Sequence, residues 1–288
     1  MAKISAKDVQ ALRAKTGVGM MDCKRALSDA EGDLDKAVVL LRERGLSKAS
    51  KRVGRVTSEG AVGIAIAGST GAIVELNCET DFVAKTDDFQ SLAGRLAEVV
   101  AGDASISDVE AALAADSDGG TVQEAIQAAI SKVGENIQLK RVARVAVDEG
   151  VVGGYVHAGA KLGVIVGLRT GASGDAVEVL TKDVAMHVAA TDPTPVSVDR
   201  DGVPADVVAK EKEILRKQAE QSGKPEKVIE KIVDGRINKF FSENCLLEQA
   251  FVKDPDTSVG NLLKQVAGDL GSEMAVTEFV RFKLGEAG

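Results

Sequence analysis

The segment AIVELNCETDFVAK, residues 72–85, governs how the rest of the chain is interpreted. Its start, residues 72–76, is an alternating apolar run that predicts a half-buried β-strand. Phe82 then lies at a strand-to-helix junction, where Thr80 or Asp81 can cap the helix. Phe82 either fills this junction as core or is presented to a partner, because aromatic side chains anchor protein interfaces. The helix is predicted by apolar residues recurring at threes and fours: Phe89, Leu92, Ala93, Leu96, Val99 and Val100.

The strand and helix around this segment recur later in the chain. Residues 58–63 (SEGAVG) align with residues 148–153 (DEGVVG) at an offset of 90, and the strand at 73–76 matches 164–168. The next helix, 92–101, matches 180–189 at an offset of 88. Each copy is strand, turn, strand and helix, which predicts an α+β fold whose duplicated core has small antiparallel sheets with helices on one face.

The two copies are expected to differ beyond their helix. Helical stretches near 106–115 and 121–134 extend the first copy, which gives a core subdomain N at 57–140. A weakly alternating run at 142–148 is expected to open the second copy, core subdomain C, at 141–200 and 242–288. In the latter part of that subdomain, strands are expected at 246–251 and 276–284, with a helix at 259–266.

An inserted module is predicted at 201–241. Two helical patterns, 204–220 and 228–240, flank the turn Ser222–Pro225, which predicts an antiparallel helical hairpin. Its apolar stripe is narrow, as in coiled coils. The two helices could therefore form a coiled coil with each other or with a second copy of the chain, and the sequence does not decide between these alternatives.

The first 56 residues predict a small three-helix domain and a linker. Helices are expected at 5–16, 20–30 and 34–45, the last ended by Gly45 as a C-cap. Residues 1–56 hold thirteen Lys and Arg against seven Asp and Glu, a net +6 in a chain of net −8. The basic linker is either a solvated hinge or a contact for nucleic acid or an acidic surface: Lys48, Lys51, Arg52 and Arg55.

Composition limits the class of protein. The 288 residues suffice for about two domains, and the 3% aromatic content provides few rings for stacking nucleobases. With the net negative charge, this argues against a nucleic-acid partner. We expect no signal peptide and no membrane span, because the start of the chain lacks an apolar segment and the longest apolar stretches are interrupted by Gly and charge. Cys23, Cys78 and Cys245 give no disulfide or zinc spacing, which favours a reducing, cytoplasmic setting.

No catalytic or metal-binding motif is found. The two histidines, His157 and His187, allow no convincing Ser/His/Asp or Cys/His grouping; His187 is expected to pack in the core and His157 to be exposed. Walker A, HExxH and strand-led GxGxxG sequences do not occur. We therefore expect no cofactor, no metal, no direct nucleotide binding and no catalysis of a chemical reaction. The alternative that the chain is an enzyme rests only on Cys23 and Cys78 as possible nucleophiles.

A second specific motif lies in the first domain, at residues 12–27 (LRAKTGVGMMDCKRAL). Met20 and Met21 come after a Gly-x-Gly loop. Adjacent residues of a short helix point in different directions, so we expect at least one of these methionines to be exposed. The alternative is that both pack in the small three-helix core. An exposed thioether adapts readily to a partner surface. With residues 31–37, the pattern is like that of ubiquitin-associated domains, where the loop between the first two helices binds.

Residues 16–27 and 77–85, in this order and separation, closely resemble bacterial elongation factor Ts. Further segments support the resemblance along essentially the whole chain: 133–137, 155–157, 186–190, 221–225, 235–236 and 279–282. Some members of that family continue past the last of these segments with an additional helix, whose contact is not carried over to this chain.

The resemblance implies a guanine-nucleotide exchange factor for elongation factor Tu, the GTPase that delivers aminoacyl-tRNA to the ribosome. It implies that the loop with Thr80, Asp81, Phe82 and Val83 wedges into the GTPase and disturbs its magnesium and phosphate region. It further implies two docking surfaces. The hairpin could serve dimerisation or contact between complexes, and the sequence does not decide whether the chain forms a homodimer or a dimer of heterodimers. The residues of the docking surfaces are Leu12, Met20, Met21, Asp22 and Lys24 in the first domain, and His157, Gly235 and Arg236 for core subdomain C. The alternative is an adaptor for protein or RNA, suggested by the basic first domain.

Overall fold

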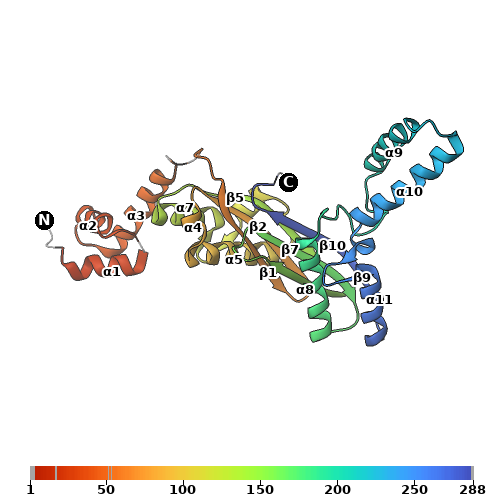
Figure 1. Cartoon of the computed structure of the whole chain (residues 1–288). Coiled ribbons are helices and arrows are strands. Elements are labelled where there is room, and N and C mark those ends of the chain that lie inside the picture. The colour runs from red at the N-terminus through yellow and green to blue at the C-terminus, as the bar shows by residue number, and fades with distance from the viewer. Residues whose placement is uncertain (1–3, 17, 51, 53, 287–288) are drawn as a thin grey trace.

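The computed structural model describes residues 4–16, 18–50, 52 and 54–286, with the backbone alone for 45–50. A three-helix domain comes first, at the far left of Figure 1. Its helices pack around fully buried side chains that include Leu12, Cys23 and Leu27, so the predicted small core is confirmed. Its elements are α1 (Ala6–Thr16), α2 (Met20–Asp29) and α3 (Leu34–Ser50).

The prediction that Gly45 ends the third helix is wrong, because α3 continues to Ser50. An interior glycine costs a helix about 1 kcal/mol relative to alanine, which neighbouring contacts can offset.

The first domain contacts the core through α3, where Arg42 forms an ion pair with Glu124 of the core. A cleft of about 540 Å³ lies between this domain and the core.

The linker prediction is resolved for two residues. Arg52 donates to the Ile130 carbonyl over 3.3 Å, and Arg55 forms an ion pair of 3.4 Å with Glu79. These side chains contact the core and are not part of a fully solvated hinge. Lys51 lies outside the described residues, and of Lys48 the structure describes only the helical backbone.

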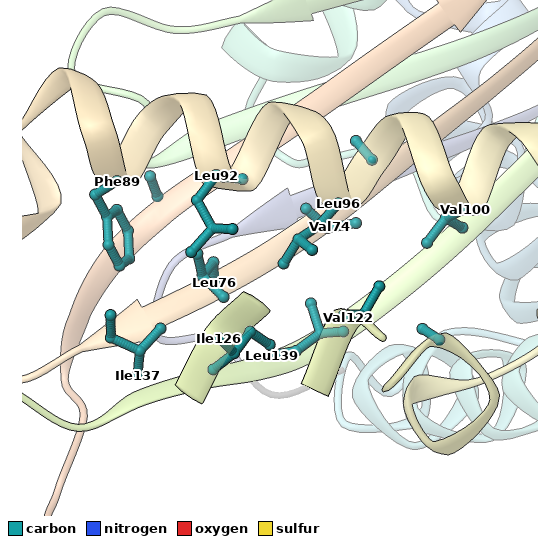
Figure 2. Packing of buried hydrophobic residues seen from close by; sticks show 14 of the residues in the cluster. Val74, Leu76, Phe89, Leu92, Leu96, Val100, Val122, Ile126, Ile137 and Leu139 are labelled. Atoms are coloured by element: carbon teal, nitrogen blue, oxygen red, sulfur yellow. The ribbon is translucent and has the colours of Figure 1, made fainter. Parts of the chain in front are cut away.

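The first core unit is a three-stranded antiparallel sheet in the order β1-β2-β5, covered by helices. The long helix α5 lies over the sheet, and Figure 2 shows its Leu92 and Leu96 beside Leu76 and Val74 of the central strand. The strands are β1 (Glu59–Ala67), β2 (Thr70–Cys78) and β5 (Ile137–Ala146), with a short hairpin of β3 (Asp116–Ser117) and β4 (Gly120–Thr121). The helices are α4 (Asp81–Ala84), α5 (Asp87–Gly102), α6 (Val109–Ala114) and α7 (Val122–Val133).

Two expectations about this unit are wrong. The run at 142–148 does not open the second copy; it belongs mostly to β5, which pairs antiparallel with β2 and completes the first sheet. In addition, β2 is not half-buried, because residues 71–78 are all buried. Helix α5 covers one face of β2, and the second sheet packs on the other, where Val62 and Ile73 meet Ile165 and Phe282.

The second core unit repeats the first. Its sheet has the order β10-β7-β6, so β7 is central as β2 is, and helix α8 covers it as α5 covers β2. Gly60 and Gly150 occupy the same place in the two units: a Cβ there would collide with the neighbouring strand's carbonyl oxygen, of Leu76 and Leu168 respectively. The duplication is thus confirmed at the level of single residues. The elements are β6 (Gly150–Val156), β7 (Leu162–Thr170), α8 (Asp175–Ala190), β8 (Ala250–Phe251), β9 (Asp254–Ser258), α11 (Val259–Leu270) and β10 (Met274–Lys283). Residues 246–248 form a 3₁₀ turn, η1 (Leu246–Glu248), where a strand was expected.

The inserted hairpin consists of α9 (Ala205–Glu220) and α10 (Glu226–Asn244), and it projects away from the sheets (Figure 1). Its base is joined to the core through Arg200, which donates from Nε and Nη2 to the Glu248 carboxylate and stacks over the Phe241 ring at 4.8 Å. Across the described residues, no helix has the length and apolar character that crossing a membrane requires.

Candidate functional site

The tip, residues 80–83, is a single helical turn between β2 and α5. Thr80 caps α4, and its hydroxyl accepts from the Val83 N–H. Val83 is half-buried and Ala84 is buried against the first core, whereas the Phe82 side chain is 82% exposed. Of the two alternatives for Phe82, core packing is excluded by this exposure. The structure presents the ring to solvent on a short helix that is packed from behind.

Asp81 stays ionised beside the ring. The Lys85 ammonium donates to its carboxylate over 2.6 Å, which lowers the pKa of Asp81, and the charge of Lys161 lowers it further. A bare aromatic ring with a carboxylate next to it gives the tip one apolar and one anionic contact. Such a pair is suited to insertion beside polar or cationic groups of a protein surface.

The loop after α7, residues 134–136, holds the base of the tip. Glu135 accepts two hydrogen bonds from Thr80, one from the backbone N–H at 3.0 Å and one from the hydroxyl at 2.6 Å. In the opposite sense, the Glu79 carboxylate accepts from the Asn136 N–H at 2.7 Å. Sequence reasoning did not single out Glu135 as a functional residue; a Gly-Glu-Asn sequence directly after a helix was the available signal, and its partner lies 55 residues away.

The turn between β6 and β7 brings the second core unit to the tip. Val62 of β1 donates to the Ala160 carbonyl over 2.7 Å, and Lys161 forms a 2.7 Å ion pair with Glu59. The Lys161 charge acts on Asp81, so this turn and the tip lie at the same end of the molecule. His157 lies in this turn, exposed as expected, with its Nδ1 2.9 Å from the Tyr155 hydroxyl.

The residues singled out in the first domain divide into exposed and buried. Met20 is 50% and Met21 66% exposed, so the alternative in which both pack in the core is wrong. Lys24 is exposed and Asp22 half-buried. Leu12, by contrast, is fully buried among Cys23 and Leu27, so its side chain supports the domain from inside and does not face a partner. Leu34 and Val39, which the sequence did not single out, add exposed apolar surface to this domain.

Gly235 and Arg236 do not lie beside His157. Both are exposed on α10 of the projecting hairpin, where Arg236 donates to Gln218 of α9 over 3.1 Å. Their grouping with core subdomain C is therefore corrected: they belong to the hairpin.

The remaining reactive side chains are buried. The Cys23, Cys78 and Cys245 thiols are inaccessible, and burial raises the pKa of Cys78 to about 12, assisted by the charge of Glu135. His187 is fully buried, as expected, between Gln249 and the Val252 N–H. In the part of the chain that the structure describes, no three His, Cys, Asp or Glu side chains gather as a metal site would require.

Comparison with known proteins agrees with this architecture. Residues 79–286 match the family model described as "Elongation factor TS". The "Elongation factor Ts" of Chlorobium phaeobacteroides (strain BS1) is 50% identical over 291 residues, covering 99% of this chain and 100% of that protein. Those of Maricaulis maris (strain MCS10) and Clostridium perfringens (strain SM101 / Type A) are 45% and 46% identical, covering 99% and 98% of this chain and 93% of each relative. The chain belongs to the elongation factor Ts family of translation elongation factors.

Proposed function

We propose that this chain is a guanine-nucleotide exchange factor that binds elongation factor Tu carrying GDP and releases the GDP, so that GTP can bind. The tip is proposed to disturb the magnesium and phosphate region of the GTPase. The observation that carries the proposal is the exposure of Phe82 beside an ionised Asp81 on a turn that is fixed from behind. The activity would be exerted in the cytoplasm, where translation takes place.

The physical basis is a coupling between two binding events. A factor that weakens GDP binding is itself bound more weakly when GDP is present, because the coupling free energy is reciprocal. Magnesium neutralises the phosphate oxygens, so loosening its site removes much of the grip on the nucleotide. Burying the Phe82 ring yields about 1.5–3 kcal/mol, which can offset the distortion of the GTPase. The factor lowers the barrier in both directions, and the GTP to GDP ratio sets the direction.

Two further surfaces are proposed to contact the same partner. The exposed Met20 and Met21, with Asp22 and Lys24, provide an adaptable patch on the first domain. His157 is presented at the same end as the tip and would extend its contact surface. Neither surface needs the chain to bind nucleotide itself.

The test is the release of fluorescent GDP from purified elongation factor Tu, measured with the wild-type chain and with Phe82→Ala. We expect fast release with the wild type and a loss of at least about 2 kcal/mol of transition-state stabilisation, roughly thirtyfold, in the variant. Val179→Ala, which trims a 58% exposed valine on α8, is the matched control and should act as the wild type. A folded wild-type chain that does not speed up release would refute the proposal.

A further inference from the structure

The connection between β2 and α4 is held by two carboxylates that act in opposite directions. Glu135 accepts the N–H and the hydroxyl of Thr80, while Glu79 accepts the N–H of Asn136 and pairs with Arg55. Asn136 is buried and donates from its side chain to the Arg55 carbonyl over 2.9 Å. Residues 79–80 and residues 135–136 are thus held together by hydrogen bonds that run in both directions.

The tip needs such a restraint. Helix α4 has only four residues, and a single helical turn is not stable by itself in water. The Phe82 ring is exposed, so no packing of its own fixes the direction in which it points. That direction depends on the backbone of Thr80, which has φ −128° and ψ 153°, and on the packing of Val83 and Ala84.

We propose that Glu135 is a positioning residue for the tip, a role that rests on the proposed exchange function. Its carboxylate fixes Thr80 before the partner arrives, so that the Phe82 ring is presented in one orientation. A loop that is ordered in advance loses less conformational entropy on binding, and binding is stronger by that amount. Glu135 acts through Thr80 and need not touch the GTPase.

The chemistry favours a carboxylate at this position. Thr80 offers two donors, and an ionised carboxylate has an acceptor oxygen for each. A glutamine would have a single oxygen, so its NH₂ group would either oppose the Thr80 N–H or make the Thr80 hydroxyl turn to accept a neutral hydrogen bond. Hydrogen bonds to a charged acceptor are also about twice as strong as neutral ones. The Thr80 hydroxyl can still accept from Val83 while donating to Glu135, so the clamp and the helix cap share one side chain.

The experiment measures kcat/KM for GDP release with Glu135→Gln, Thr80→Val and the double variant, each also in a Phe82→Ala background. Hydrogen exchange of the Thr80 amide and thermal unfolding are recorded on the same full-length proteins. Glu273→Gln, at an exposed carboxylate between α11 and β10, is the matched control. It should leave exchange activity, Thr80 protection and Tm unchanged.

We expect Glu135→Gln to lower kcat/KM about tenfold, the effect of losing one hydrogen bond to a charged group. The Thr80 amide should exchange faster, while Tm should fall by only a few degrees. Adding Thr80→Val should cost little more, and in the Phe82→Ala background Glu135→Gln should be almost silent, because there is no ring left to position. This non-additivity separates positioning from a general loss of stability.

Two results would overturn the inference. One is wild-type activity of Glu135→Gln together with a loss in Phe82→Ala, which would leave the exchange function intact and remove the role of Glu135. The other is an equal loss from Glu135→Gln with and without Phe82, which would make its effect independent of the Phe82 ring. Failure of the wild-type chain itself to release GDP would refute the proposed function, and the positioning role with it.

Discussion

Glu75 of β2 and Arg141 of β5 form an ion pair within the first sheet, and Arg141 also contacts the second core unit. Arg141 donates from Nε to the Glu75 carboxylate over 2.7 Å, and the two side chains, Arg141 and Glu75, are only 16% and 3% exposed. The same guanidinium donates to the Lys283 carbonyl over 3.0 Å and lies 4.4 Å from the centre of the Phe282 ring. Both of those residues are in β10, so the pair in the first sheet also holds the edge strand of the second.

Breaking this pair should destabilise the fold strongly. Glu75→Ala leaves the Arg141 charge buried without its carboxylate, and removing one partner of a buried pair costs about 3–5 kcal/mol. Urea unfolding of the full-length chain measures the change. Glu213→Ala, in an i,i+4 pair with Lys217 whose side chains are 64% and 70% exposed, is the control and should leave the urea midpoint unchanged. Equal effects of the two substitutions would mean that the buried Glu75–Arg141 pair contributes no more to stability than an exposed pair does.

His187 should make stability fall as the solution becomes mildly acidic. Gln249 donates its amide hydrogens to the Pro193 and Glu243 carbonyls, so its oxygen faces His187 Nε2, while Nδ1 accepts from the Val252 N–H. This assigns a neutral ring with the proton on Nε2. A second proton would have to sit on Nδ1 against another donor, and burial lowers the pKa of His187 below its usual 6.5.

Since the folded pKa is lowered, the unfolded chain takes up the proton first as the pH falls. The contribution of His187 is therefore complete above about pH 6.5 and is lost as the pH drops through the folded value. Unfolding free energies measured by urea at pH 7.5 and 6.0 should differ less in His187→Gln than in the wild type. His157→Gln removes the other histidine, which is exposed, and should keep the wild-type difference. An unchanged pH dependence in His187→Gln would contradict the assignment.

Local patterns in the sequence were enough to predict the repeated units, because each rests on short-range periodicity. The offset between Gly60 and Gly150 is visible in the sequence and recurs in the structure as the same close approach to a carbonyl oxygen. Local patterns could not show which sheet a strand joins. The run at 142–148 reads equally well as the end of one unit or the start of the next, and only its pairing with β2 decides.

In the candidate site, too, local sequence patterns selected residues but could not show how those residues pack. Phe82 could be selected from the sequence, but its exposure depends on Val83 and Ala84 filling the space behind it. Leu12 was chosen with Met20 and Met21 because they share a motif, yet helical geometry turns Leu12 into the core. The contact between Thr80 and Glu135 spans 55 residues and has no signature in the sequence near Thr80.

The methionine patch should contribute to affinity without contributing to stability. Met20→Ser with Met21→Ser removes two thioethers that are 50% and 66% exposed, so Tm should stay near that of the wild type. If the patch docks on elongation factor Tu, KM for GDP release should rise about thirtyfold or more, because truncating each of two interface anchors costs more than about 1 kcal/mol. Val179→Ala again serves as the exposed apolar control. A wild-type KM in the double variant would remove this surface from the proposed interface.

The hairpin should matter more for self-association than for exchange. Val207, Ile214 and Val228 are each about 40% exposed on helices that project from the core, while Leu215 and Ile229 are buried within the pair. Replacing residues 206–236 with a short Gly-Ser linker keeps the base around Arg200, Glu248 and Phe241. Sedimentation velocity of the wild type and the shortened chain, at matched concentrations, should then show weaker self-association of the latter, while GDP release stays within about twofold. Arg236→Ala in the intact chain is the companion variant, since the linker also removes Gly235 and Arg236. Loss of GDP release in both proteins, with unchanged sedimentation, would instead assign the hairpin to the contact with the GTPase.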